Sequence, residues 1–245
     1  MTLLVDILKK IVKKTLSFLG IGVYRLSSTP KKLPTAQGLV ILSPIHHNTK
    51  ERLDEYYSSP EVVDAYLSTE RQKFYVDVAH FLVEMGIKYD GKMIADVGCG
   101  TGHLLRHIHD TFKPLLLTGF EYSKAAIEIC RSTVPDAEFE YLDIYEDVNR
   151  KFDIVFCIEV MEHLLLPKKA LGHLMDMVEV GGVLMITVPD GRKDTFEGHI
   201  HFWSPESWNV FIIDVSECRG FKVHTGTLKP HGTNYAVLEA EEKHD

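Results

Sequence analysis

The sequence contains no run of about 18 apolar residues, so it predicts no membrane-spanning helix. Its 4 cysteines lie far apart and include no C-x-x-C pair, which excludes a disulfide framework and a cysteine-ligated zinc site. A reducing, cytoplasmic environment is therefore expected. Basic residues are not in excess, because 27 Lys and Arg stand against 35 Asp and Glu, and the net charge of −8 disfavours a nucleic-acid partner. The 245 residues suffice for one α/β domain with a substantial core and an added segment.

A glycine-rich turn stands between an expected strand and an expected helix. The apolar residues 92–95 precede D-V-G-C-G-T-G at 96–102, and a helix-like run follows at 103–108. Alternate glycines let the backbone turn tightly and approach a ligand, and the helix after them points free N–H groups back at the turn. This order predicts a site for a nucleoside-bearing cofactor. No Gly-Lys-Ser/Thr closes the turn, which excludes a P-loop.

An acidic residue closes each of three successive expected strands, namely Asp96, Glu121 and Asp143. A carboxylate just before the first glycine would repel a pyrophosphate, but it can accept hydrogen bonds from a cationic cofactor. Glu121 follows the glycines by about 20 residues, where an acid can accept both hydroxyls of a ribose. Asp143 can accept from an adenine amino group while Ile144 flanks the ring. A domain with merely solvated acids would not explain this regular placement.

These features resemble the class I S-adenosylmethionine-dependent methyltransferases over about residues 70–240, including F-D-I-V-F-C-I-E at 152–159 and G-G-V-L-M-I-T-V-P at 181–189. The resemblance implies a Rossmann-like, doubly wound α/β fold. It has a seven-stranded, mostly parallel sheet with an antiparallel last strand, plus N-terminal helices. It also implies S-adenosylmethionine (SAM) as cofactor. The cofactor-binding residues that it predicts are Arg71, Asp96, Gly98, Cys99, Gly100, Gly102, Glu121, Tyr122, Asp143, Ile144 and Glu159.

Two helices are predicted ahead of the glycine-rich turn. Ser59 can cap the first, with Pro60 at its first position, and the second runs from about Thr69 to Met85. In methyltransferases of this type such helices cover the cofactor and the substrate mouth. Arg71 could meet the methionyl carboxylate of SAM, although an exposed helical arginine fits the same pattern. The expected domains are an N-terminal segment and linker at 1–50, a helical cap at 51–90 and the methyltransferase domain at 91–245.

Glu159, Glu162 and His163 stand at i, i+3 and i+4, so one helical turn beginning at Glu159 would place them on one face. With His199 or His201 from a later loop they could form an octahedral site for Mg²⁺ or Mn²⁺. The E-x-x-E-H pattern resembles the ubiquinone-pathway catechol O-methyltransferases. It also resembles the small-RNA 3′-terminal 2′-O-methyltransferases, whose later metal-binding histidine His199 matches. Related methyltransferases with the same string bind no metal, so both alternatives stay open.

Without a metal, His199 is the first candidate for a general base and His201 the second, because an imidazole titrates near pH 6.5. Glu159 is a further catalytic candidate beside the cofactor. The alternative for either histidine is a structural hydrogen bond in a loop.

The amino-terminal segment is basic and amphipathic. Residues 1–32 hold seven Lys and Arg against one Asp, a net charge of 7 − 1 = +6, and apolar residues recur there at helical spacing. Residues 1–26 could form a helix at the inner membrane surface, or one packed on its own domain or on a homodimer partner. Residues 27–50 are expected to be an irregular linker.

The function predicted from the sequence is O-methylation of a hydroxyl on a small-molecule, glycan or lipid-linked acceptor, with N-methylation left open. One alternative is a metal-assisted RNA 2′-O-methyltransferase, which the net charge of −8 disfavours. The other is a non-catalytic cofactor-binding or membrane-docking module.

Overall fold

The computed structural model describes residues 33–35, 38–40 and 48–241. The helix expected within residues 1–26 lies outside these described residues. The chain divides into two compact units, and the boundary lies between Ser43 and Pro44. In the first unit, β1 (Leu33–Thr35) pairs antiparallel with β2 (Gly38–Val40), so the segment predicted as an irregular linker contains two short strands. Among the described helices, none is long and apolar enough to cross a membrane.

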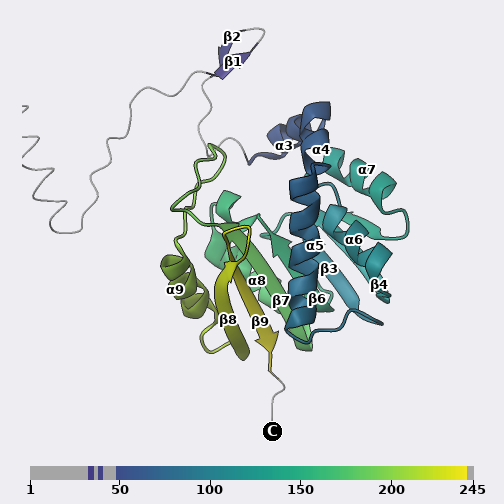
Figure 1. The fold of residues 1–245 in the computed structure, drawn as a ribbon, viewed down its shortest axis with the longest axis vertical. Coiled ribbons are helices and arrows are strands. Elements are labelled where there is room, and N and C mark those ends of the chain that lie inside the picture. The colour runs from purple at the N-terminus through teal and green to yellow at the C-terminus, as the bar shows by residue number, and fades with distance from the viewer. Residues whose placement is uncertain (1–32, 36–37, 41–47, 242–245) are drawn as a thin grey trace, which may run out of the picture. The chain divides into compact units, whose positions relative to one another are not determined.

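The second unit is built on a seven-stranded sheet in the order β5-β4-β3-β6-β7-β9-β8 (Figure 1). Its strands are β3 (Met93–Val97), β4 (Leu116–Glu121), β5 (Glu138–Tyr141), β6 (Phe152–Ile158), β7 (Val178–Pro189), β8 (Phe221–Leu228) and β9 (Thr233–Ala240). Strands β3 to β7 pair in parallel, and β9 lies antiparallel between β7 and β8. The prediction of a doubly wound, mostly parallel sheet with an antiparallel last strand is confirmed.

The helices begin at the residue types that favour a helix start. They are α3 (Lys50–Tyr57), α4 (Pro60–Tyr66), α5 (Thr69–Glu84), α6 (His103–Thr111), α7 (Lys124–Thr133), α8 (Pro167–Asp176) and α9 (Pro205–Ser216). Side chains of Ser68, Ser123 and Ser204 each accept a backbone N–H from the first turn of α5, α7 and α9. Pro60 and Pro205 occupy first helical positions, as the sequence predicted.

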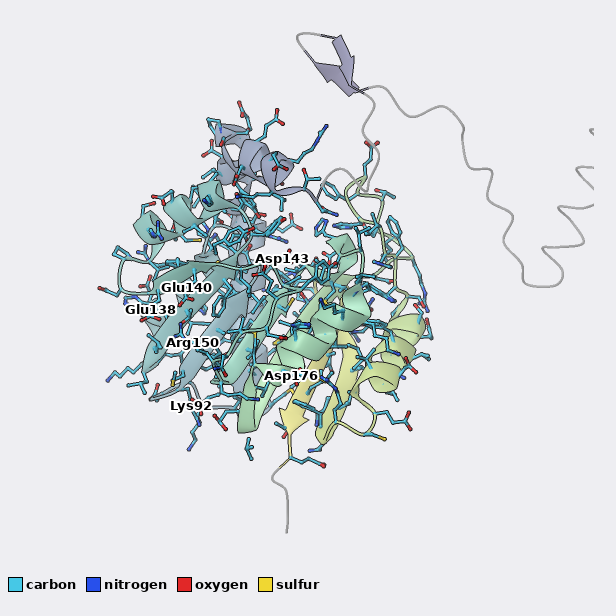
Figure 2. The ribbon with its side chains drawn as sticks, turned by 180° about the vertical axis from the view of Figure 1, so that it is seen from behind. Lys92, Glu138, Glu140, Asp143, Arg150 and Asp176 are labelled. Atoms are coloured by element: carbon cyan, nitrogen blue, oxygen red, sulfur yellow. The ribbon has the colours of Figure 1, made fainter. Side chains whose placement is uncertain are left out.

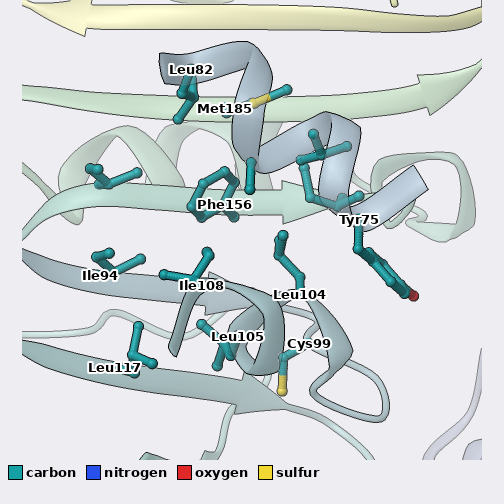
Figure 3. Close-up of a cluster of buried hydrophobic side chains, with 14 of the residues drawn as sticks. Tyr75, Leu82, Ile94, Cys99, Leu104, Leu105, Ile108, Leu117, Phe156 and Met185 are labelled. Atoms are coloured by element: carbon teal, nitrogen blue, oxygen red, sulfur yellow. The ribbon is translucent and has the colours of Figure 1, made fainter. Parts of the chain in front are cut away.

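Both faces of the sheet are buried, because successive strand residues alternate between two apolar cores. Ile94 and Phe156 belong to the core that α5, α6 and α7 cover, and Figure 3 shows this cluster. Their neighbours Ala95 and Cys157 belong to the opposite core, against α8 and α9. Apolar residues at consecutive strand positions therefore stabilise a sheet layered between helices.

The carboxyl ends of β3 to β7 meet at one end of the sheet, where ligands bind in open α/β folds. Figure 2 shows Asp143 near this end, whereas Lys92, which precedes β3, lies at the opposite end. Helices α3 and α4 lie at the same end as Asp143, and α3 contacts α7 (Figure 1). This end of the sheet therefore holds the candidate site.

Candidate active site

The glycine-rich turn adopts a backbone that only glycine accepts readily. Gly98, Gly100 and Gly102 have φ values of 77°, 54° and 79°. A Cβ atom on Gly98 would stand 2.5 Å from a methyl group of Val160. The Gly98 N–H donates to the Phe120 carbonyl at 2.8 Å, which holds the turn against β4. The turn is therefore fixed in shape and leaves no room for side chains at its centre.

Glu121 is a buried carboxylate at the end of β4, and only 6% of the residue is exposed. Its Oε2 accepts from the Gly100 N–H at 2.9 Å, and its Oε1 accepts from the Tyr122 and Ser123 N–H groups at 2.8 and 2.9 Å. Burial raises its pKa, and these three donors oppose that rise. The carboxylate is thus held beside the glycine turn, where it could accept the hydroxyls of a ribose.

Asp96 is the last residue but one of β3, just before the turn, and 2% of it is exposed. Burial, together with the nearby charge of Glu121, raises the pKa of Asp96 to about 8. Near neutral pH its carboxyl is therefore mostly protonated. A bound cation would favour the charged form.

Asp143 and Ile144 follow β5 at the same end of the sheet and are half-buried. The Leu142 N–H donates to the Glu121 carbonyl at 3.1 Å, which brings this loop beside β4. The Asp143 Oδ1 accepts the Tyr145 N–H at 3.0 Å, so its side chain is oriented. The structure thus brings Asp96, Glu121 and Asp143 to one end of neighbouring strands, as the sequence predicted.

Tyr57 and Tyr66, which the sequence did not indicate as site residues, cover the glycine-rich turn. The Tyr57 hydroxyl lies 3.2 Å from the position of a Cβ on Gly100, and it lies 3.1 Å from the Tyr66 hydroxyl. Asp54 joins α3 to the start of α7, because its carboxylate accepts from the Ser123 hydroxyl at 2.7 Å. The tyrosines in the predicted cap helices were the only signal for this contact.

Arg71 lies among aromatic rings and is half-buried. Its guanidinium carbon lies 5.6, 5.5 and 5.4 Å from the ring centres of Tyr66, Phe74 and Tyr75. Its Nε donates to the Tyr75 hydroxyl at 3.2 Å. Arg71 also lines a cavity of about 400 Å³ that includes Glu159. Arg71 is thus half-buried at a cavity and not an exposed helical arginine.

Glu159 departs from the predicted helical turn. Its φ is 57°, in the left-handed region, and a 3₁₀ turn, η1 (Met161–His163), begins only two residues later. The expectation that helical spacing from Glu159 aligns it with Glu162 is therefore wrong. Its Oε1 accepts from the Thr187 hydroxyl at 2.9 Å. Burial raises the pKa of Glu159 to about 7, against the opposing charge of Arg71.

Glu162, His163 and His199 gather their side-chain ligand atoms within 4.8 Å of one another. The Nε2 atoms of His199 and His163 lie 3.7 and 4.0 Å from the Glu162 Oε1. Glu162 is 1% exposed, and neither of its carboxylate oxygens has a hydrogen-bond partner within the described part of the chain. Burial raises the pKa of Glu162 well above its ordinary value. A buried carboxylate without donors is the arrangement that a cation would satisfy.

The two histidines of this group are oriented by their other ring nitrogens. The His199 Nδ1–H donates to the Asp194 carboxylate at 2.5 Å, and the His163 Nδ1–H donates to the Gly198 carbonyl at 3.1 Å. Since these partners accept, Nδ1 carries the hydrogen in each ring, and the Nε2 atoms of both rings lie on the side of Glu162. Metal-binding histidines are commonly held in this way. The residues present therefore fit a divalent cation, and Asp194 is a member of the group that sequence reasoning missed.

His201 lies outside this group. Its Nε2 donates to the Leu164 carbonyl at 2.9 Å, and its ring stacks on Trp203 at 4.8 Å between centres. The structural alternative for His201 therefore fits its contacts better than a role as a base.

A sequence model of the methyltransferase domain family matches residues 67–212, more than half of the chain. The chain belongs to this methyltransferase family. The matched range contains the glycine-rich turn, Glu121, Glu162 and His199. This is the family that the glycine-rich turn and the acids at the strand ends predicted.

Individual relatives are distant. A protein of Invertebrate iridescent virus 6 named as a methyltransferase is 22% identical over 143 residues, 58% of this chain and 54% of that one. Trans-aconitate 2-methyltransferase of Escherichia coli O139:H28 (strain E24377A) is 30% identical over 100 residues, 40% of each chain. This methyltransferase thus spans about half or less of the length of these relatives. Magnesium protoporphyrin IX methyltransferase of Synechocystis PCC 6803, solved with bound SAM, shares the fold with a TM-score of 0.61 and 16% identity, covering 78% of this chain and 97% of that one.

Proposed function

We propose that the enzyme transfers the methyl group of SAM to a hydroxyl oxygen of a small-molecule, glycan or lipid-linked acceptor. The observation that carries this proposal is the group formed by Glu162, His163 and His199 near the cavity. The charges of Glu159 and Arg71, which line the cavity, act on Glu162. A hydroxyl must lose a proton when it accepts a methyl group, and imidazole and carboxylate groups assist that loss.

The cofactor would lie across the carboxyl ends of β3, β4 and β5. Glu121 accepts the ribose hydroxyls, Asp143 accepts from the adenine amino group, and Tyr122 and Ile144 flank the base. Asp96 faces the cationic part of the cofactor. These roles are supported by the burial of Asp96 and Glu121 and by the fixed hydrogen bonds of Glu121 to the turn.

The other end of SAM would face the cavity. Arg71 lies between aromatic rings, and only its Nε has a hydrogen-bond acceptor among the described residues. The remaining guanidinium N–H groups can bind the methionyl carboxylate as a bidentate pair. The sulfonium would then lie near Glu159, with the transferable methyl directed into the cavity where the acceptor enters.

The protein contributes alignment rather than covalent chemistry, because a sulfonium is already a good leaving group. Tyr57 and Tyr66 lie over Gly100 and would limit the access of water to the bound cofactor. The cavity of about 400 Å³ would hold the acceptor oxygen in line with the methyl carbon and the sulfur.

We also propose that Glu162, His163 and His199 hold a divalent cation such as Mg²⁺ or Mn²⁺. Glu159 stands outside this group, since its Oε1 accepts from Thr187. The unpartnered buried oxygens of Glu162 support the proposal. A cation bound there would lower the pKa of an acceptor hydroxyl.

A methyl-transfer screen tests the acceptor class. The protein is incubated with SAM carrying a deuterated methyl group and with polyhydroxylated aromatics, glycans, lipid-linked hydroxyl compounds, amines, carboxylates and RNA. Carboxylates are included because one relative acts on trans-aconitate. Mass spectrometry should find the label on a hydroxyl compound. Label only on amines, carboxylates or RNA would overturn the acceptor class, and binding of SAM without any transfer would indicate a non-catalytic module.

A further inference from the structure

A histidine outside the group of Glu162, His163 and His199 lines the cavity. His231 lies in the turn between β8 and β9, and Arg71 and Glu159 line the same cavity. The His231 ring meets the Phe74 ring edge-on at 5.1 Å between centres, and Arg71 lies against the same Phe74 ring. His231 and Arg71 therefore flank one aromatic side chain in the cavity wall.

Asp77 on α5 orients this histidine. The His231 Nε2–H donates to the Asp77 Oδ2 at 2.7 Å, and their side chains are 13% and 25% exposed. Lys73 donates to the same oxygen. Burial works against it, yet these two donors hold the pKa of Asp77 below its ordinary value, so the carboxylate is charged at neutral pH.

The bond to Asp77 fixes the tautomer of His231. A carboxylate only accepts, so Nε2 carries the hydrogen and Nδ1 carries the lone pair. Among the described residues, no hydrogen-bond donor or acceptor is assigned to the Nδ1 of His231. His231 is thus held by a carboxylate through one ring nitrogen and lines a cavity, and general-base histidines share this arrangement.

We propose that His231 is the general base that accepts the hydroxyl proton of the acceptor, with Asp77 as its positioning residue; this inference rests on the proposed O-methyl transfer. The Nδ1 lone pair takes the proton while the acceptor oxygen forms a bond to the methyl carbon. The carbon–sulfur bond breaks, and its electron pair stays on sulfur in S-adenosylhomocysteine. Asp77 stabilises the imidazolium, which then releases the proton to solvent.

Any substitution at His231 is made among other titratable and charged groups. The titratable and charged groups around it are Lys73, Asp77, Glu70 and Arg71 from α5, Tyr56 and Tyr66 from α3 and α4, Glu159 after β6, and Lys193, which lies beside Gly232. A variant that retains these groups and removes only the basic nitrogen is therefore needed to isolate the role of His231.

The experiment uses the full chain and the acceptor found by the screen, and it compares His231→Gln, Asp77→Asn and the control His80→Gln. A glutamine amide can still donate to Asp77, so His231→Gln preserves the structural contact but has no base. We expect its kcat to fall by about 100-fold or more, with SAM affinity and thermal midpoint near the wild type. The acidic limb of its kcat against pH should disappear. Asp77→Asn should lower kcat less and shift this limb to lower pH, whereas His80, exposed on α5, should give a silent variant.

Two results would overturn the proposal. A His231→Gln enzyme that retains its kcat within about threefold, with the acidic limb intact, would show that His231 only joins the turn to α5. An inactive wild type that transfers no methyl group to any hydroxyl acceptor would overturn the proposed function itself. The two failures are distinguished by the activity of the wild type.

Discussion

Glu121 and Glu162 are two buried glutamates at the same end of the sheet, with opposite surroundings. Glu121 accepts three backbone N–H groups at 2.8 to 2.9 Å. Glu162 is more deeply buried and has no hydrogen-bond donor among the described residues, but two imidazole nitrogens lie 3.7 and 4.0 Å away. The peptide backbone satisfies the first carboxylate, whereas the second lacks a positive partner.

This difference separates two kinds of binding site. A carboxylate fixed by backbone donors is already oriented before a ligand arrives, which suits the neutral hydroxyls of a ribose. A desolvated carboxylate beside two oriented imidazoles is costly until a cation neutralises it. In the proposed arrangement, the cofactor site would be formed by the chain itself, and the Glu162 group would be completed by a cation.

The largest expected effect comes from Glu162. Glu162→Ala removes the carboxylate that lies beside both imidazoles and should lower methyl transfer by more than about 100-fold, because the divalent cation is no longer held. Metal content measured by inductively coupled plasma spectrometry should fall in parallel, while SAM affinity is retained. Full activity of the wild type after exhaustive dialysis against a chelator would contradict the metal proposal.

Replacing Glu121 tests the other side of the comparison. Glu121→Ala removes the ribose acceptor and leaves three N–H groups without their partner, so SAM affinity should fall by about 100-fold, or about 3 kcal/mol. Isothermal titration calorimetry measures this loss. The exposed Glu128 on α7 provides the matched control, Glu128→Ala, which should bind SAM normally. Unchanged affinity in Glu121→Ala would remove the ribose role.

A substitution of Asp194 tests whether the orientation of His199 matters for cation binding by the Glu162 group. Asp194→Asn weakens the acceptor that fixes the Nδ1–H of His199, so the affinity for Mn²⁺ should fall by about 10-fold. Titration followed by paramagnetic relaxation of water protons reports this change. If SAM affinity fell instead, Asp194 would belong to the cofactor site.

The smallest effect concerns the pH dependence of stability. Asp96 has a pKa of about 8 in the folded protein against 3.8 ordinarily, so its contribution to stability is complete below pH 4 and is lost as the pH rises toward 8. Between pH 5 and 7, the free energy of unfolding of the wild type should therefore fall with rising pH. The slope should be steeper than that of Asp96→Asn by about 1 kcal/mol per pH unit. Urea unfolding in the presence of a chelator measures the two slopes. Parallel slopes would mean that Asp96 is charged in the folded protein.

The strands and the acids at their ends could be predicted because each depends on a local pattern. The apolar runs are continuous where both faces of the sheet are covered, as in β3 and β4 with Asp96 and Glu121, whereas Asp143 follows the short edge strand β5, in which only Phe139 is buried. Chain order then places these acids at one edge of the sheet, since parallel strands share their carboxyl ends.

The rest of the site could not be predicted because it depends on contacts between remote segments. His231 and Asp77 are 154 residues apart in sequence, and nothing near either residue indicates the other. The left-handed backbone of Glu159 also has no sequence signal, because a residue other than glycine occupies that conformation. The helical spacing of the E-x-x-E-H string therefore wrongly predicted that Glu159 lies on one face with Glu162. The structure does bring Glu162 and His163 together with His199.

The helices that carry Tyr57 and Tyr66, α3 and α4, bear on how a bound cofactor would exchange. Helices α3 and α4 bury none of their own residues against the described part of the chain, and Asp54 holds α3 to α7. An element held so lightly can separate from the sheet while both apolar cores stay closed. Departure of S-adenosylhomocysteine from the proposed site would then require only local opening of these helices.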